Sequence, residues 1–172
     1  MYRIDLNELA IIAAKARGAI DRIYLHWTAG HYESTFEDYH LNITGDGGIY
    51  LSTEDLTKVL AHTWHRNTGA IGIALCCCVD ATIRVDGNFD LGTEPPTSEQ
   101  IESMAQVVAL LSDVLQVSIT HAEVGDLDGY GPAYIGTDKF EKWDLWKLRD
   151  YDGLWRNGGD VIRGKAIWYL NI

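Results

Sequence analysis

Basic residues are scarce in this chain. Only 14 lysines and arginines stand against 25 aspartates and glutamates, which gives a formal charge of −11. Proteins that bind nucleic acids normally present a basic face, and anionic membrane surfaces attract positive side chains. The charge balance therefore argues against a nucleic-acid partner and against electrostatic attachment to a membrane. It fits a protein whose affinity for its substrate does not come from bulk charge.

The beginning of the chain lacks a long uncharged hydrophobic run. Residues 1–21 read MYRIDLNELAIIAAKARGAID, and charged side chains interrupt the apolar ones from Arg3 to Arg17. A secretory signal has an uninterrupted apolar core, and a membrane-spanning helix needs about 20 mostly apolar residues. We therefore expect neither a cleavable signal peptide nor membrane insertion.

Cysteine is confined to one run, Cys76–Cys78, within the apolar segment IGIALCCCV. Neighbours on a strand point to opposite faces, so the run is a poor disulfide framework, and it lacks the C-x-x-C spacing of zinc sites. We interpret the three residues as small buried hydrophobic side chains in a protein made in a reducing compartment. The alternatives are metal binding or redox chemistry at Cys77 or a neighbour, and a cysteine hydrolase built on the run.

The remaining composition is that of one globular domain. The 172 residues are 47% hydrophobic, which is enough for one well-buried core and little for two. Periodicity predicts helices over residues 6–16, 97–115 and 162–170, strands over 22–26, 70–79 and 117–120, and a hairpin over 38–52. Residues 85–96 and 125–138 are expected to be loop, and 143–159 to be irregular. This order of elements predicts a single α/β domain over residues 1–172, with a mixed central sheet flanked by helices.

Two histidines stand at the ends of predicted strands. His26 ends the strand in IYLHWTAG, and His121 ends the one in VSITHAEV. They can converge at one edge of a sheet, where ligands of open α/β sheets bind, or they can be two separate, hydrogen-bonded histidines.

A third candidate segment is EKWDLW, in which Lys142 and Asp144 project to the same side if the chain is extended. Two imidazoles and one carboxylate form a ligand set that catalytic zinc uses. A lysine beside zinc is repelled by the metal, but it is useful where negative charge develops during a reaction.

At this point the motifs resemble, in order, those of a known family. The chain is similar to the zinc-dependent N-acetylmuramoyl-L-alanine amidases of the type 2 amidase and peptidoglycan recognition protein family, which includes small phage lysozymes of amidase type. The matching segments are residues 23–30, 38–50, 61–75, 95–111, 119–124 and 142–144.

The resemblance implies a zinc ion held by His26, His121 and Asp144 at one edge of the sheet. It implies that Lys142 faces the developing oxyanion. Tyr39 would orient or deprotonate the zinc-bound water, or hydrogen-bond the tetrahedral intermediate. The plainer alternatives are that Tyr39 is a core aromatic residue and that Lys142 is a surface charge.

The resemblance also implies a substrate groove beside the metal. His62 occupies the position of a groove histidine, and Asn67 in the same segment is assigned to substrate binding. Trp27 and Trp64 flank the expected site, where aromatic faces could stack on sugars. His65 is interpreted as a solvated loop residue.

The chain departs from the family pattern at several positions. Ala74 stands where many members carry a glutamate, so a carboxylate base from that strand is missing and more weight falls on Tyr39. The third ligand is an aspartate where other branches use cysteine, and Leu145 and Trp146 replace a Pro-Gly pair. Residues 29–38 are too few for the helix that many relatives place there.

The resemblance therefore implies hydrolysis of the amide between N-acetylmuramic acid and L-alanine in peptidoglycan, by a monomer that takes peptidoglycan or muropeptides as substrate. The rival functions are a non-catalytic peptidoglycan-binding module and a zinc peptidase that cuts within the stem peptide. Three delivery routes stay open: a phage endolysin, a secreted antibacterial effector and a cytoplasmic recycling enzyme. The first two would act on the cell wall after release or secretion.

Overall fold

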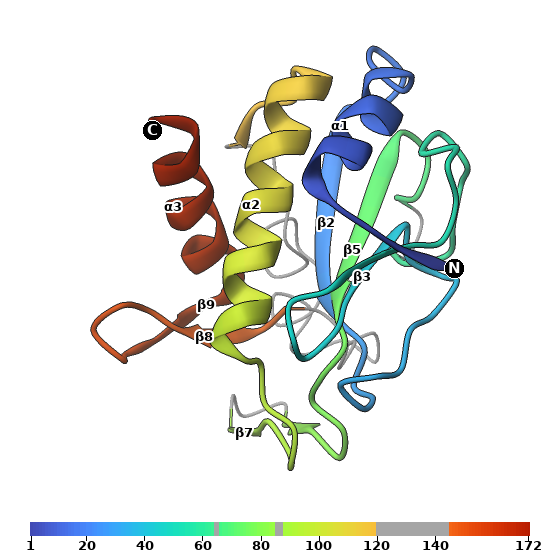
Figure 1. The fold of residues 1–172 in the computed structure, drawn as a ribbon. Coiled ribbons are helices and arrows are strands. Elements are labelled where there is room, and N and C mark those ends of the chain that lie inside the picture. Colours follow the sequence, from blue (N-terminus) through green and yellow to red (C-terminus); the bar gives the residue numbers. More distant parts are fainter. Residues whose placement is uncertain (64–65, 85–87, 120–144) are drawn as a thin grey trace.

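The computed structural model describes residues 1–63, 66–84, 88–119 and 145–172, and within these residues a five-stranded mixed sheet forms the centre of an α/β domain (Figure 1). Its strands, in spatial order, are β1 (Tyr2–Ile4), β4 (Ile49–Leu51), β3 (Leu41–Ile43), β5 (Ala70–Leu75) and β2 (Arg22–Trp27). The predicted fold class is confirmed.

The centre of the sheet is parallel and one side of it is antiparallel. Strand β5 pairs in parallel with β2 and with β3, whereas β4 pairs antiparallel with β3 and β1. All six residues of β5 are buried, as its continuous apolar sequence predicts. The predicted hairpin over residues 38–52 is confirmed as β3 and β4.

Helices lie on one face of this sheet. They are α1 (Leu6–Ala14), α2 (Ser98–Leu115) and α3 (Gly158–Leu170). Figure 1 shows α1 and α2 in front of the strands, and α3 packs against α2. The capping box predicted from Thr97 and Gln100 is present, because each side chain bonds the backbone N–H of the other.

Gln100 also anchors α2 to the sheet. Its side chain is fully buried, and Nε2 donates to the carbonyl oxygens of Ile43 at 2.9 Å and of Cys76 at 2.8 Å. These two carbonyls lie at the ends of β3 and β5. The buried Gln100 amide therefore accepts a hydrogen bond from the Thr97 N–H at the start of α2. It also holds this end of the helix against the C-terminal ends of two parallel strands.

The two faces of the sheet differ in chemistry because strand side chains alternate. The side chains that join the main hydrophobic core are all apolar: Ile23, Leu25, Trp27, Leu41, Ile43, Ile71, Ile73 and Leu75. The residues between them point to the opposite face: Tyr24, His26, Asn42, Gly72 and Ala74. The second face is therefore the polar face, and it carries His26.

Three expectations from the sequence were wrong. A small hairpin of β6 (Thr82–Ile83) and β7 (Phe89–Asp90) enters the segment expected to be loop, and β8 (Lys147–Arg149) and β9 (Trp155–Asn157) pair in the segment expected to be irregular. These strands are too short to show alternation in the sequence. The described part of the predicted strand over residues 117–120 is not a strand, because the Val117 N–H closes the end of α2 by bonding the Ser112 carbonyl oxygen.

In the part of the chain that the structure describes, no helix combines the length and the apolar character needed to cross a membrane.

Strand β5 supplies a direct test of this architecture. Ile73 has no exposed surface and lies between β2 and β3. Truncation to alanine removes buried methyl groups and leaves a cavity, so Ile73→Ala should lower the free energy of unfolding by about 2–5 kcal/mol. Urea unfolding measures this loss. A change within experimental error would show that β5 is not a central strand.

Candidate functional site

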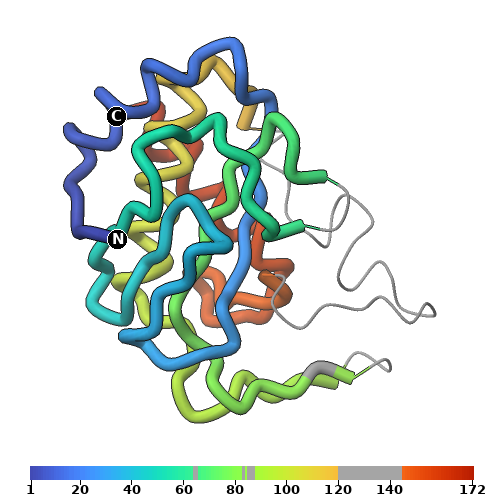
Figure 2. Tube along the Cα trace, turned by 90° about the vertical axis from the view of Figure 1, so that its right-hand side faces the viewer, coloured from blue at the N-terminus to red at the C-terminus, as the bar shows by residue number. Residues whose placement is uncertain are grey.

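The polar face of the sheet brings two aromatic side chains, Tyr39 and His62, next to His26. This histidine lies near the C-terminal end of β2 and is fully buried. Its ring centroid is 5.2 Å from that of Tyr39 and 5.5 Å from that of His62. Tyr39 lies two residues before β3, and His62 comes from the segment between β4 and β5. Figure 2 shows residues 60–63 and 66–70 on the opposite side of the sheet from α2.

His62 fits on this face because Gly72 leaves room for it. A Cβ atom at Gly72 would lie 2.5 Å from His62 Cγ, far inside van der Waals contact. Burial, followed by repulsion from the charged forms of His26 and His40, lowers the pKa of His62 to about 2. The imidazole is therefore neutral at physiological pH, and it acts as a hydrogen-bonding group rather than as a cation.

Thr63 links the two histidines. Its hydroxyl lies 3.0 Å from His62 Nδ1 and 3.3 Å from His26 Nε2, and all three groups are buried. The backbone N–H of Thr63 donates to Asn67 Oδ1 at 2.8 Å. Asn67, expected to bind substrate, thus has its carbonyl oxygen engaged in holding the Thr63 segment in place.

His40 is a buried histidine of this face that sequence reasoning did not single out. Its Nδ1 accepts a hydrogen bond from the Gly72 N–H at 3.1 Å, so Nε2 carries the proton and donates to the Lys58 carbonyl oxygen at 2.8 Å. Burial lowers the pKa of His40, and its ring lies 5.6 Å from that of His62. The signal was present in the spacing of His40 and Asn42, which puts both on the polar face.

A pocket of about 290 Å³ opens beside this cluster. It is lined by Thr28, Phe36, Asp38, Tyr39, Ala61 and His62. Tyr39 therefore reaches both the pocket and the His26 ring. A substrate group in the pocket would meet a phenol and a neutral imidazole.

The other predicted site residues divide into two groups. Trp27 has no exposed surface and packs in the helix-side core, so a sugar ring cannot reach its indole in this arrangement. His121, Lys142, Asp144 and Trp64 lie outside the described residues. Within the described ranges, no three His, Cys, Asp or Glu side chains form a group that could hold a metal ion.

The cysteine run has the structural role expected for it. All three thiols are buried and form no disulfide. Burial raises the pKa of the Cys76 thiol to about 12 and also raises the pKa of the Cys77 thiol, which disfavours a nucleophilic thiolate at these two positions at neutral pH. The alternative of a cysteine hydrolase has no support in this environment.

A comparison with known families bears on this cluster. The family model of N-acetylmuramoyl-L-alanine amidase matches residues 16–132, which is more than half of the chain. The chain belongs to this amidase family. No curated protein and no solved structure gives a significant match. Within the amidase, the matched segment includes His26, Tyr39, His62 and His121, and it ends before Lys142 and Asp144.

The strand register shows what the departure at Ala74 means in this amidase. Ala74 on β5 pairs with His26 on one side and with Asn42 on the other. Asn42 bonds the backbone of Phe36 through both its oxygen, at 2.9 Å, and its nitrogen, at 3.0 Å. The position next to His26 is thus a methyl group, and Asn42 beyond it holds the wall of the pocket.

The contact between Gly72 and His62 predicts an unusual response to substitution. Gly72→Ala should displace the His62 ring and destabilise the protein by about 1–3 kcal/mol, as overpacked buried sites do. Gly164→Ala is the matched control, since a Cβ there meets open space within α3 and should stabilise the protein by up to about 1 kcal/mol. Urea unfolding measures both changes.

A second measurement ties the effect to His62. If the clash is the cause, Gly72→Ala should cost less in a His62→Ala background, so the double variant should lose less stability than the sum of the two single variants. Equal costs in the two backgrounds would contradict the proposed contact.

Proposed function

We propose that this amidase is zinc-dependent and hydrolyses the amide between the lactyl group of N-acetylmuramic acid and L-alanine of the stem peptide. Members of the family act on peptidoglycan, and the matched segment carries the buried cluster of His26, Tyr39 and His62. That cluster next to a small pocket is the observation that supports the proposal most directly.

In the proposed site, zinc is held by His26, His121 and Asp144. His26 suits this role because it is a buried imidazole at the C-terminal end of a parallel strand, with Thr63 beside its Nε2 to fix its orientation. When bound, zinc would polarise the scissile carbonyl and lower the pKa of a coordinated water toward neutrality.

Tyr39 is proposed to handle a proton or to hydrogen-bond the reacting centre. Its ring lies 5.2 Å from that of His26 and borders the pocket, which supports a role for its phenol at a substrate carbonyl bound beside His26. Because position 74 is an alanine, that position supplies no carboxylate base. In this proposal Lys142 stabilises the developing oxyanion and Tyr39 transfers the proton.

His62 is proposed to bind substrate. It lines the pocket, and within the described residues its buried Nε2 makes no hydrogen bond of normal geometry, although the ring interacts with the Ala70 backbone. Buried polar atoms in native proteins almost always have a partner. A polar group of the substrate that enters the pocket would supply one, and the neutral state of the ring lets it bond an amide or an acetamido group.

Product analysis tests the proposed reaction. Purified protein incubated with peptidoglycan should release intact stem peptides that begin with L-alanine, and leave glycan with unsubstituted muramic acid. Mass spectrometry identifies both products. Peptides shortened within the stem would establish the rival peptidase, and binding to peptidoglycan without any product would establish the rival binding module.

Two substitutions test the proposed roles of Tyr39 and Lys142. Neither residue is a proposed ligand, so Tyr39→Phe and Lys142→Ala should both keep bound zinc. Tyr39→Phe should lower kcat by about 10²–10⁴-fold and Lys142→Ala by about 10²–10³-fold, with KM little changed. Tyr2→Phe, on β1 at the edge of the sheet opposite β2, is the control for loss of a phenol. Near-normal turnover in Tyr39→Phe would mean that another group handles the proton.

A further inference from the structure

Another concave surface lies on the side of the sheet that the helices cover. Apart from Glu102, the residues that line it come from the C-terminal part of the chain. It has a volume of about 770 Å³ and runs between α2, α3 and the β8–β9 hairpin. Its aromatic lining residues are Tyr151, Trp168 and Tyr169, and we call it the aromatic groove. Figure 1 shows the hairpin projecting beside α3. Most of the lining comes from residues 150–169, beyond the segment that the family model matches.

The aromatic groove exposes large rings to solvent. Tyr151 is 93% exposed and Trp168 is 61% exposed, although rings of this size are usually at least half-buried. Its volume lies within the range of small-molecule binding sites. Exposed aromatic rings around a hollow of this size mark a binding surface.

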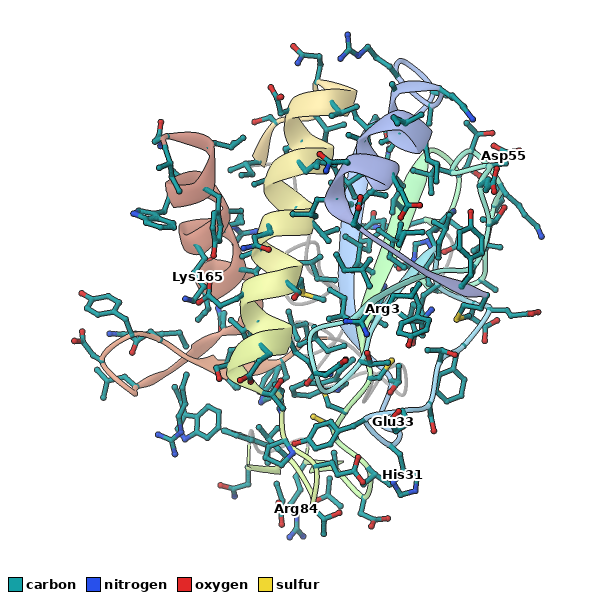
Figure 3. All side chains as sticks on the ribbon, viewed as in Figure 1. Arg3, His31, Glu33, Asp55, Arg84 and Lys165 are labelled. Atoms are coloured by element: carbon teal, nitrogen blue, oxygen red, sulfur yellow. The ribbon has the colours of Figure 1, made fainter. Side chains whose placement is uncertain are left out.

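The groove is held in shape by hydrogen bonds on its floor. The Tyr169 hydroxyl donates to Glu102 Oε2 at 2.7 Å, and Lys165 pairs with the other oxygen of the same carboxylate. Figure 3 labels Lys165 where α3 meets α2. The Trp168 ring packs edge-to-face on Tyr169 with centroids 4.9 Å apart. The Trp168 and Tyr169 rings are therefore held in place before any ligand arrives, which reduces the entropy lost on binding.

The charges of the groove are already paired with one another. Asp150 accepts from Arg156 at 3.0 Å, Asp160 pairs with Arg163 at 2.5 Å, and Glu102 pairs with Lys165. These three ion pairs therefore leave none of their own charges unpaired to attract a charged peptide. The net charge of −11 also disfavours an anionic lipid surface. The surface suits a neutral ligand that combines apolar faces with a hydrogen-bonding rim.

We propose that the aromatic groove binds a neutral oligosaccharide of β-linked N-acetylated amino sugars. A pyranose ring has an apolar face of C–H groups that stacks on Trp or Tyr, and its hydroxyl and acetamido groups can bond the paired ions of the rim. The choice of N-acetylated amino sugars rests on the proposed function, since these are the sugars of peptidoglycan. The groove would then hold the protein on the glycan polymer and raise the effective concentration of cleavable stems at the catalytic cluster.

The test uses the full chain and chitotetraose, a neutral tetramer of N-acetylglucosamine that carries no stem peptide. Isothermal titration should detect binding, and Trp168→Ala and Tyr151→Ala should each weaken it roughly tenfold, the loss expected for one aromatic platform. Ile167→Ala, an exposed α3 residue that does not line the groove, is the matched control and should bind normally. Circular dichroism verifies that each variant is folded.

Two further arms separate this proposal from the proposed function. His26→Ala should abolish amidase activity and keep chitotetraose binding, and Trp168→Ala should cleave small soluble muropeptides normally but polymeric peptidoglycan more slowly. Absence of binding at millimolar chitotetraose, or binding that both groove variants leave unchanged, would overturn the proposal whatever the amidase assay shows. Binding to neutral lipid vesicles that Trp168→Ala removes, without sugar binding, would assign the groove to a membrane surface instead.

Discussion

The alternation of side chains along three parallel strands is the constraint on which the rest of the structure depends. Strands β2, β3 and β5 send apolar residues to the helices and the residues between them to the polar face. A register shift of one residue would exchange the two sets and put His26 among the helices. The hydrophobic core that fixes the register thereby also fixes the side of the sheet on which the proposed chemistry would take place.

The side chains on the polar face pack over small residues of the central strand, β5. Gly72 makes room for the His62 ring, and Ala74 lies between His26 and Asn42. The buried imidazoles of this layer have specific hydrogen-bond partners, as the bonds of His40 to Gly72 and to the Lys58 carbonyl illustrate. Such hydrogen bonds fix the orientation of a ring, which is what the proposed reaction would require of this layer.

Strong periodic signals in the sequence predicted most of the sheet and the helices. The Thr97 capping box, the apolar run of β5 and the hairpin over residues 38–52 are local patterns, and all three are present. The partners of His62 were not predictable, because they depend on how a loop folds back over a strand. Val117 is a β-branched residue of the kind that favours strands, but its N–H donates to the Ser112 carbonyl oxygen at the end of α2.

The metal content of variants tests the central claim, that β2 delivers His26 as a zinc ligand, most directly. Protein purified with zinc should contain about one ion per chain, and His26→Ala should contain almost none because a three-ligand site loses its metal when one ligand is removed. His62→Ala, which removes an equally buried imidazole 5.5 Å away, should keep its zinc. A His26→Ala protein with the zinc content of the wild type would contradict the claim.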